Sequence, residues 1–542
     1  MEFAILIVLI LVIIIGITIH AKIKYAQDLK AKIASAFGSV PDKDAMNLES
    51  IRRYAEYVKH HDLRIDSITW NDLDMDRVYK RINACLSSVG EEYLYNCLHE
   101  PSFEQTALLE RENLIKFFIE NPKERFDTQF ALARLGKEEY NGLASLIFDA
   151  DMKLIARPYI YKILSVMPIV FLVILIFNLA IGALGLGLSF VVNLLVRERA
   201  MKLVDVEIPA IAYFSFMLKC CRRLYKIEPL SKLPILDEMR KPYSIFKKVV
   251  SNAPTARQGI QADIAESFWM YLNIMFLFDI RHYNRLIELI IRYNQEFHHI
   301  YKTIGEIDVA ISVLSFRNSL PVFSTPEFNN VNVLDFEEIY HPLIEKPVTN
   351  THKFDKDSLI TGSNASGKST FIKTLAINGI LAQTIFTCTA KRFASRPAMI
   401  VTSMAVRDDL LGGESYFIVE IKSLKRVLDL VAKHPCICYV DEILRGTNTV
   451  ERIAASAAIL TFLNEQDCLC IVASHDIELT RLLDHDNYHF CEQVTNNEIS
   501  FDYKLKQGPT TTRNAIKLLE FKGFGDEIVG YAKELISSKT EN

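Results

Sequence analysis

The stretch Thr361-Gly-Ser-Asn-Ala-Ser-Gly-Lys-Ser-Thr370 decides how the C-terminal part of this chain folds. It has the pattern G-x-x-x-x-G-K-S, in which glycines let backbone N–H groups close around phosphate oxygens. An apolar run at 358–360 precedes it, and apolar residues recur at helical spacing over 371–381. We therefore expect a buried strand, the glycine loop and a helix, whose N-terminus adds partial positive charge for an anion.

The loop supplies the first candidate site residues. Lys368 is expected to reach the β- and γ-phosphates of a nucleotide, and the Ser369 hydroxyl to hold a Mg²⁺ position. The expected nucleotide-binding residues are Gly362, Ser363, Asn364, Ala365, Ser366, Gly367, Lys368, Ser369 and Thr370. The alternative is a chance match in a turn rich in glycine and serine, which the motifs downstream disfavour.

Two later apolar runs end in polar residues. The run that begins at Cys436 ends in Asp441, expected to support Mg²⁺ through its water shell, and Glu442, expected to orient or deprotonate the attacking water. The run that begins at Leu469 ends in His475, a candidate sensor of the γ-phosphate. The alternatives are acids in an ordinary surface turn and a solvent-facing histidine at a strand end.

The bulk composition limits the remaining possibilities. The chain has 542 residues, enough for about three domains, and a formal net charge of −4, so no global basic field argues for nucleic acid. Half of the residues are apolar and the mean hydropathy of +0.13 is high for a wholly soluble protein. The ten cysteines lack zinc-ligand spacing, so we expect buried, reduced thiols.

The N-terminal segment 3–19 is almost continuous isoleucine, leucine and valine, just long enough to span a bilayer. A cleaved signal peptide is the weaker alternative, because no basic residue precedes the run and no small-x-small cleavage site follows it. Four lysines come next and predict a membrane anchor whose C-terminal flank is cytoplasmic. They are Lys22, Lys24, Lys30 and Lys32.

A second apolar block, 163–196, contains no charge and is too long for one membrane pass. We expect a hairpin of two short spanning helices with both ends in the cytoplasm; the alternative is a buried helical pair in a soluble core. Together with the anchor this predicts three transmembrane helices, a multi-pass inner (cytoplasmic) membrane protein and a cytoplasmic ATPase domain. The flanking basic residues are Arg157, Lys162, Arg197, Arg199 and Lys202.

The regions 46–156 and 204–318 show helical periodicity, and short β-like runs begin near 331. The expected organisation is a transmembrane anchor (1–20), a first part of a helical core (21–156), the hairpin (160–197), a second part of the helical core (198–325), an ATPase domain (326–510) and a C-terminal helical segment (511–542).

Four segments together resemble the ATPase domain of the MutS family of DNA mismatch-repair proteins. They are the glycine loop, Asp408-Asp-Leu-Leu-Gly-Gly-Glu-Ser-Tyr-Phe-Ile-Val-Glu-Ile421, Val440-Asp-Glu-Ile-Leu-Arg-Gly-Thr-Asn448 and Ala473-Ser-His-Asp-Ile-Glu-Leu-Thr480. Tyr340-His-Pro-Leu-Ile344 looks like the segment beside the adenine, and 515–532 looks like the helix-turn-helix dimerisation piece. A weaker likeness to the family's helical core covers 65–135.

The resemblance implies an α + α/β protein with an ABC-type P-loop ATPase domain, ATP and Mg²⁺ as cofactors, and a homodimer that completes each active site in trans. It implies that Ser415 reaches the partner's γ-phosphate, that Glu442 is the general base and His475 the sensor, and that His341 borders the nucleotide. ATP binding would be coupled through the helical core to gripping or releasing DNA or another ligand.

The chain departs from the family in three ways. Ala365-Ser366 stand where the family usually has Met-Gly, a membrane hairpin interrupts the helical core, and only about 50 residues precede that core. We therefore expect no mismatch-reading domain, and take Phe118-x-Glu120, which mimics the mismatch-reading tripeptide, as part of a helix. The alternative function is a nucleotide-gated scaffold at the membrane that binds a protein or lipid; an ABC-like exporter is disfavoured, because L-S-G-G-Q is missing.

Overall fold

The computed structural model describes residues 2–42, 46–58, 63–148, 155, 157–204, 207–250, 271–363, 366–404, 416–494, 499–509, 516 and 523–540. The chain folds as two compact units, each assembled from separate stretches of sequence. Unit 1 comprises 1–59, 82–96 and 111–318, and unit 2 comprises 60–81, 97–110 and 319–542. Mixed helix and sheet confirm the expected α + α/β class in its coarse form.

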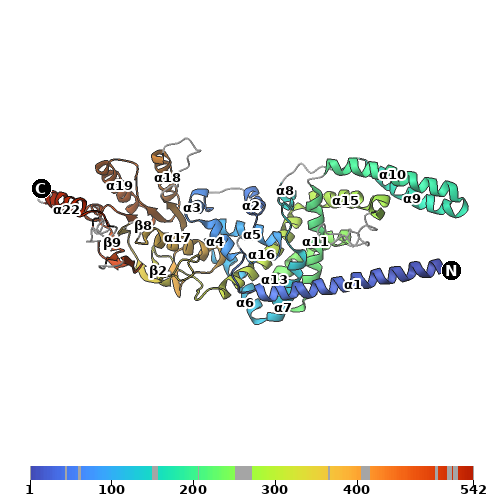
Figure 1. The fold of residues 1–542 in the computed structure, drawn as a ribbon, viewed down its shortest axis with the longest axis horizontal. Coiled ribbons are helices and arrows are strands. Elements are labelled where there is room, and N and C mark those ends of the chain that lie inside the picture. Colours follow the sequence, from blue (N-terminus) through green and yellow to red (C-terminus); the bar gives the residue numbers. More distant parts are fainter. Residues whose placement is uncertain are drawn as a thin grey trace. The chain divides into compact units, whose positions relative to one another are not determined.

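Unit 1 is helical throughout its described residues (Figure 1). Two helices, α5 (Ser88–His99) and α6 (Gln105–Glu120), are shared with unit 2. The others are α1 (Glu2–Ala36), α2 (Leu48–Tyr57), α7 (Pro122–Leu135), α8 (Leu143–Phe148), α9 (Pro158–Phe177), α10 (Leu179–Leu203), α11 (Glu207–Leu224), α12 (Glu228–Ser231), α13 (Pro234–Val250), α15 (Phe278–Arg292) and α16 (Asn294–Asn318).

Helix α16 is the centre of unit 1, because nearly every side chain from Phe297 onward is buried. Its Asp308 carboxylate is fully buried and accepts hydrogen bonds from the backbone N–H groups of Leu86 and Ser87, just before α5 begins. Such bonds satisfy donors that a helix start leaves unpaired. Phe118 on α6 is also fully buried, which agrees with its assignment to a packed helix.

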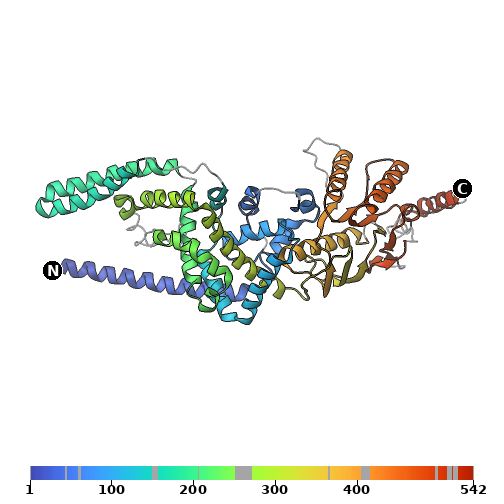
Figure 2. The ribbon, with the colours of Figure 1, turned by 180° about the vertical axis from the view of Figure 1, so that it is seen from behind.

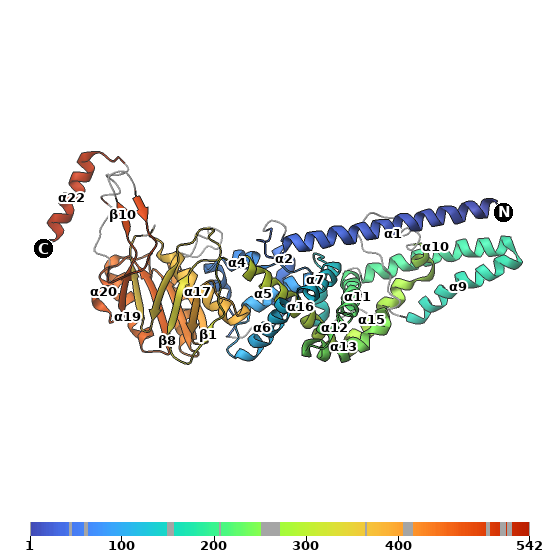
Figure 3. The same ribbon diagram turned by 90° about the horizontal axis from the view of Figure 1, so that it is seen from below.

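The second apolar block forms two antiparallel helices, α9 and α10, which break at Asn178 (Figure 3). The Asn178 side chain accepts a hydrogen bond from the backbone N–H of Ile181 and caps α10. Among the described residues these are the two helices long and apolar enough to cross a membrane. Only 11% and 22% of their most apolar windows are buried, so neither is a core helix of this chain.

The N-terminal segment is one continuous helix, α1, over Glu2–Ala36. The side chains of residues 3–15 lie outside the described residues, so the structure does not test the predicted anchor. It stays a prediction from the sequence.

Unit 2 contains a six-stranded sheet with the strand order β12-β9-β4-β8-β7-β6, parallel except for the β12–β9 pair. Its strands are β4 (Ser358–Thr361), β6 (Met399–Ser403), β7 (Cys436–Asp441), β8 (Cys468–Ser474), β9 (Asp486–His489) and β12 (Lys506–Gln507). A four-stranded sheet has β1 (Glu327–Phe328), β2 (Leu334–Ile339), β3 (Asn350–Phe354) and β5 (Arg392–Ser395), and a hairpin has β10 (Glu492–Val494) and β11 (Ile499–Phe501).

Helices cover both faces of the parallel sheet, which explains why its strands are apolar without alternation. The helices of unit 2 are α3 (Ser67–Asp72), α4 (Met75–Ile82), α17 (Lys368–Ile385), α18 (Tyr416–Val431), α19 (Thr449–Asn464), α20 (Leu479–Leu482) and α22 (Asp526–Thr540). Helices α18 and α19 pack on one face, where Figure 2 shows them (orange) side by side. Helix α17 packs on the other, with Gly379 close to Ile400.

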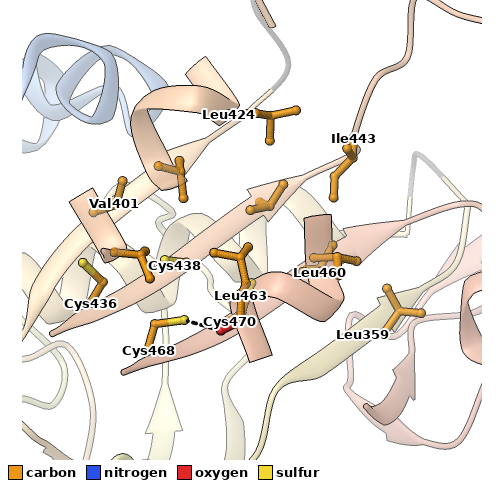
Figure 4. Packing of buried hydrophobic residues seen from close by; sticks show 14 of the residues in the cluster. Leu359, Val401, Leu424, Cys436, Cys438, Ile443, Leu460, Leu463, Cys468 and Cys470 are labelled. Atoms are coloured by element: carbon orange, nitrogen blue, oxygen red, sulfur yellow. Dashed lines mark hydrogen bonds between the residues drawn. The ribbon is translucent and has the colours of Figure 1, made fainter. Parts of the chain in front are cut away.

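The core beneath α18 and α19 contains four cysteine side chains (Figure 4). Cys436 pairs in register with Cys468, and Cys438 with Cys470, on the adjacent strands β7 and β8. All four thiols are buried and free, as expected from the sequence. Burial raises the pKa of Cys470 well above the ordinary thiol value, so this thiol is protonated and packs as an apolar group.

The segments 60–81 and 97–110 belong to unit 2. The sequence had predicted that they form part of the helical core. Asp72 at the end of α3 accepts hydrogen bonds from Thr402 Oγ1 at 2.7 Å and from the Met404 backbone N–H at 3.1 Å. At the other end of the chain, much of the predicted helix-turn-helix at 515–532 lies outside the described residues, and α22 begins at Asp526.

Candidate nucleotide-binding site

Strand register brings the candidate residues to one edge of the parallel sheet. Thr361 at the end of β4 lies opposite Ser474 on β8, and Asp441 at the end of β7 lies opposite Ala473 on β8. The glycine loop, Glu442 and His475 each follow directly after one of these strand ends. Ligands of open α/β sheets bind at this carboxyl edge.

The glycines of the loop have conformations and contacts that a side chain would disturb. Gly362 has φ +143° and Gly367 has φ +101°, a region that favours glycine. A Cβ at Gly362 would collide with the Phe490 carbonyl oxygen, and one at Gly367 would lie 2.9 Å from Tyr503 Cδ1. Gly367 directly precedes α17 as its N-cap, so the strand–loop–helix predicted from the sequence is present.

Lys368 folds back over the loop. Its side chain is buried and donates hydrogen bonds to the carbonyl oxygens of Gly362 and Ser363, the latter at 2.9 Å. Ser366 Oγ donates to the same Ser363 oxygen at 2.7 Å. A phosphate oxygen is a stronger partner for an ammonium than a backbone carbonyl, so this lysine is ready to exchange partners.

The other loop residues are placed as follows. Ser369 is half-buried and Thr370 exposed in the first turn of α17. Asn364 and Ala365 lie outside the described residues, so their expected contacts are not tested.

Asp441 offers an oxygen that fits a cation. The side chain is buried, and its Oδ1 has no hydrogen-bond partner within the described residues. A buried carboxylate oxygen without a donor suits a hydrated Mg²⁺, which commonly uses one or two carboxylates plus phosphate oxygens. The described residues contain no cluster of three or more metal-ligating side chains, and a nucleotide-bound Mg²⁺ needs none.

Glu442 has an unusual backbone conformation that is fixed by hydrogen bonds to neighbouring residues. Its backbone has φ +60°, in the left-handed region that non-glycine residues seldom adopt, and its N–H donates to the Ala473 carbonyl at 2.9 Å. The buried carboxylate accepts a hydrogen bond from Arg445 Nε, and its Oε2 lies 3.5 Å from His475 Nδ1. Strained backbone of this kind concentrates at functional sites.

His475 is half-exposed at the same edge. Burial lowers its pKa, and the charges of Arg452, Arg445 and Lys368 lower it further against the opposing effect of Asp476. The ring is therefore neutral at pH 7 and can both donate and accept a hydrogen bond. Arg452 forms two hydrogen bonds with Asp476, at 2.6 and 2.9 Å, and these fix the residue that follows His475.

His341 lies at a separate position in unit 2. Its Nδ1 accepts a hydrogen bond from the Leu343 backbone N–H at 3.2 Å. Burial lowers its pKa to about 4, with further lowering by Lys373 and Arg77, so the imidazole is neutral and can stack on an apolar ligand. Lys373 belongs to α17, which begins at the glycine loop.

One predicted site residue and two missed ones remain. Ser415 falls in 405–415, outside the described residues, so its role in trans is not tested. Two further residues at the site had no role predicted from the sequence. Arg445 pairs with Glu442, and Glu420 accepts a hydrogen bond from the Arg445 backbone N–H. Both lie inside the quoted motifs, but no pattern in the sequence indicated their pairing.

Comparison with known proteins gives a consistent result for this region. The family model described as MutS domain V matches residues 358–539. The DNA mismatch repair protein MutS of Streptococcus pyogenes serotype M49 is 28% identical over 254 residues, which are 44% of this chain and 29% of that protein. The proteins of the same name from Staphylococcus haemolyticus and Thermotoga petrophila are 29% and 28% identical, over 47% and 45% of this chain. The chain spans about three tenths of the length of these relatives.

Proposed function

The chain belongs to the MutS family through its C-terminal domain, and on that premise we propose that it binds and hydrolyses ATP with Mg²⁺. The observation that carries the proposal is the convergence of Lys368, Glu442 and His475 at one edge of the parallel sheet.

Each residue has a role that follows from its surroundings. Lys368 exchanges the carbonyl oxygens of Gly362 and Ser363 for phosphate oxygens when the P-loop closes around ATP. Glu442 orients the attacking water and accepts its proton, and neutral His475 donates a hydrogen bond to the γ-phosphate or that water. Mg²⁺, held by Ser369 and Asp441, would neutralise phosphate charge when bound.

We further propose a homodimer in which Ser415 of one subunit reaches the nucleotide of the other, with the C-terminal helical segment at 511–542 as the dimerisation element. Both assignments come from the family resemblance. Helix α22 supports the second, because its exposed apolar residues Ile528, Tyr531 and Leu535 recur at helical spacing.

The proposed output is a change in the helical unit that grips or releases DNA, since the relatives are named as DNA mismatch repair proteins. A nucleotide-gated scaffold at the inner membrane is the second candidate. The observation that favours it is the exposed apolar surface of α9 and α10, which suits a bilayer and a membrane-attached protein.

The ATPase proposal is tested by steady-state ATP hydrolysis and nucleotide binding of the full-length protein. Lys368→Ala should abolish both, and Lys356→Ala, an exposed lysine just before the same strand, should leave them unchanged. Equal turnover in the two variants would contradict the assignment of the loop.

The DNA proposal is tested separately, by filter binding of duplex DNA to the detergent-solubilised dimer with and without ATP at two salt concentrations. DNA binding should respond to ATP and weaken as salt rises, because phosphate contacts release counterions. ATP hydrolysis without salt-sensitive DNA binding would favour the scaffold.

A further inference from the structure

The outer surfaces of α9 and α10 are apolar and exposed between residues 163 and 196. Exposure is highest where the two helices meet: Ile176 is 81% exposed, Phe177 84% and Leu179 75%. The residues 163–196 include no charged side chain. A surface of this kind on a folded protein requires an apolar partner.

The seam between the two helices is built from small residues. Gly182, Gly185 and Ser189 on α10 are buried against α9, and a Cβ at Gly182 or Gly185 would collide with Leu175 or Phe171. In lipid there is no hydrophobic driving force for helix association, because the acyl chains are as apolar as the side chains. Helices therefore associate by close van der Waals packing over small residues. The seam and the exposed outer faces together point to a bilayer as the occupant.

The base of the hairpin has a polar boundary. Asn193 Nδ2 on α10 donates to the carbonyl oxygens of Leu164 at 3.2 Å and Met275 at 2.6 Å. Arg281 donates to Ser165 Oγ on α9 at 3.0 Å, and Arg197 pairs with Asp279 at 2.7 Å. The Arg281 charge therefore reaches the level of Ser165 on α9, and the Met275 backbone carbonyl reaches the level of Asn193 on α10. We place the start of the hydrocarbon layer beyond these polar contacts.

The length that remains is too short to cross a membrane. At a rise of about 1.5 Å per residue, 166–177 of α9 extend about 18 Å and 179–192 of α10 about 21 Å. The hydrocarbon core is about 30 Å thick. The tip at Asn178 would therefore stop inside it.

The polar groups at the tip agree with this depth. The Asn178 side chain accepts from the Ile181 backbone N–H, its own N–H donates to Ile174 O at 2.8 Å, and its carbonyl accepts from the Gly182 N–H at 2.9 Å. These bonds pair part of the polar backbone at the reversal, which lowers the cost of placing it in hydrocarbon.

Interfacial residues occur at one end of the hairpin only. Tyr159, which is 58% exposed, and Tyr161 lie at the base, and so do several basic residues suited to anionic headgroups. The basic residues are Arg157, Lys162, Arg199 and Lys202. No tyrosine, tryptophan or charge stands at the tip.

We propose that α9 and α10 form a re-entrant hairpin that enters an anionic phospholipid bilayer from one face and returns to it, with Asn178 within the hydrocarbon. This replaces the two spanning helices expected from the sequence and rests on the membrane attachment proposed above.

The test uses full-length protein added to preformed vesicles of phosphatidylcholine and phosphatidylglycerol. Flotation with the vesicles first establishes membrane attachment. Cysteine is then introduced at the tip, Phe177→Cys, or as the matched control at the base, Tyr159→Cys. A membrane-impermeant maleimide is supplied outside the vesicles or entrapped within them, and labelling of the protein without a new cysteine gives the background.

The base cysteine should label from outside. The tip cysteine should label from neither side of intact vesicles and fully in detergent, and a bimane at this position should be quenched by lipids brominated deep in the acyl chain. Labelling from the lumen would show a spanning hairpin and overturn the inference.

The remaining outcomes separate the two proposals. Labelling of the tip from outside, with flotation retained, would overturn the hairpin while leaving membrane attachment to α1. Loss of flotation would overturn the attachment itself. If the tip cysteine is not labelled by the maleimide in detergent, the protein itself covers the tip, and this result would also overturn the inference.

Discussion

His475 Nδ1 lies 3.5 Å from Glu442 Oε2, although the two residues follow different strands of the sheet. The Glu442 backbone N–H bonds to Ala473, two residues before the histidine, so the two side chains are positioned by one strand pair. A neutral imidazole and a carboxylate at this separation can share one water molecule between them.

Glu442→Gln should abolish ATP hydrolysis while ATP binding remains. The amide keeps the size and hydrogen-bonding reach of the side chain but does not accept a proton, so turnover should fall about 10²–10⁴-fold. Nucleotide affinity and single-turnover hydrolysis are the measurements, with the exposed Glu465→Gln as control. Normal hydrolysis by the first variant would remove Glu442 from the role of general base.

Arg445→Ala should move the acid limb of the pH–rate profile to higher pH. The Arg445 charge is one of the causes that lower the pKa of His475, after burial, so its removal raises that pKa. In the variant, His475 is protonated at a pH where the wild-type ring is still neutral. A protonated ring no longer accepts a hydrogen bond, so activity is lost at that pH.

The limb is read from kcat/KM between pH 5 and 8, with the exposed Lys425→Ala on α18 as control. A limb that stays in place in Arg445→Ala, whatever the loss of rate, would rule out this coupling.

Gly362→Ala should weaken ATP binding and lower the melting temperature. The position has φ +143°, which costs a non-glycine residue about 1–3 kcal/mol, and the new methyl group collides with the Phe490 carbonyl. Gly187→Ala in α10 is the matched control, because nothing lies within 4 Å of a Cβ there and alanine favours a helix. Equal ATP affinity in the two variants would mean that the loop tolerates a side chain.

Glu92→Gln should change how unit 1 stability depends on pH. Glu92 is buried and accepts hydrogen bonds from Asn141 Nδ2 at 2.5 Å and Tyr301 OH at 2.7 Å. Burial raises its pKa from 4.5 to about 7 in the folded protein. The contribution of Glu92 to the free energy of unfolding is therefore fully present below pH 4.5 and is lost as the pH rises through 7.

The difference in melting temperature between Glu92→Gln and wild type should grow in favour of the variant from pH 4.5 to 7 and level off above. The exposed Glu56→Gln on α2 serves as control. A constant difference across that range would show that Glu92 ionises normally.

The central strands and the glycine loop could be predicted from the sequence because each carries a local signal. Buried parallel strands read as short apolar runs, and the loop glycines are required by their conformation. Register then determines that Lys368, Glu442 and His475 meet at one edge, which the order of the motifs already indicated.

The pairing of Arg445 with Glu442 could not be predicted, because it depends on left-handed backbone at Glu442 and Leu444, for which no glycine gives a signal. The assignment of 60–81 and 97–110 to unit 2 was also missed. The partners of these short helices, such as Thr402 for Asp72, lie in a part of the sequence far from them. The proposed hairpin depth rests on contacts with a third segment, 275–281, and local hydropathy cannot reveal such contacts.

The bond between Asp72 and Thr402 joins residues 330 positions apart, and this has a consequence for biosynthesis. At about 5–20 residues per second, a ribosome needs on the order of 15–70 s to add that length. Until then Trp70 and Leu73, which end up buried in unit 2, have no finished sheet to pack on. The nascent chain therefore carries an uncovered apolar segment for most of its translation, and chaperones that bind exposed apolar segments would find one here.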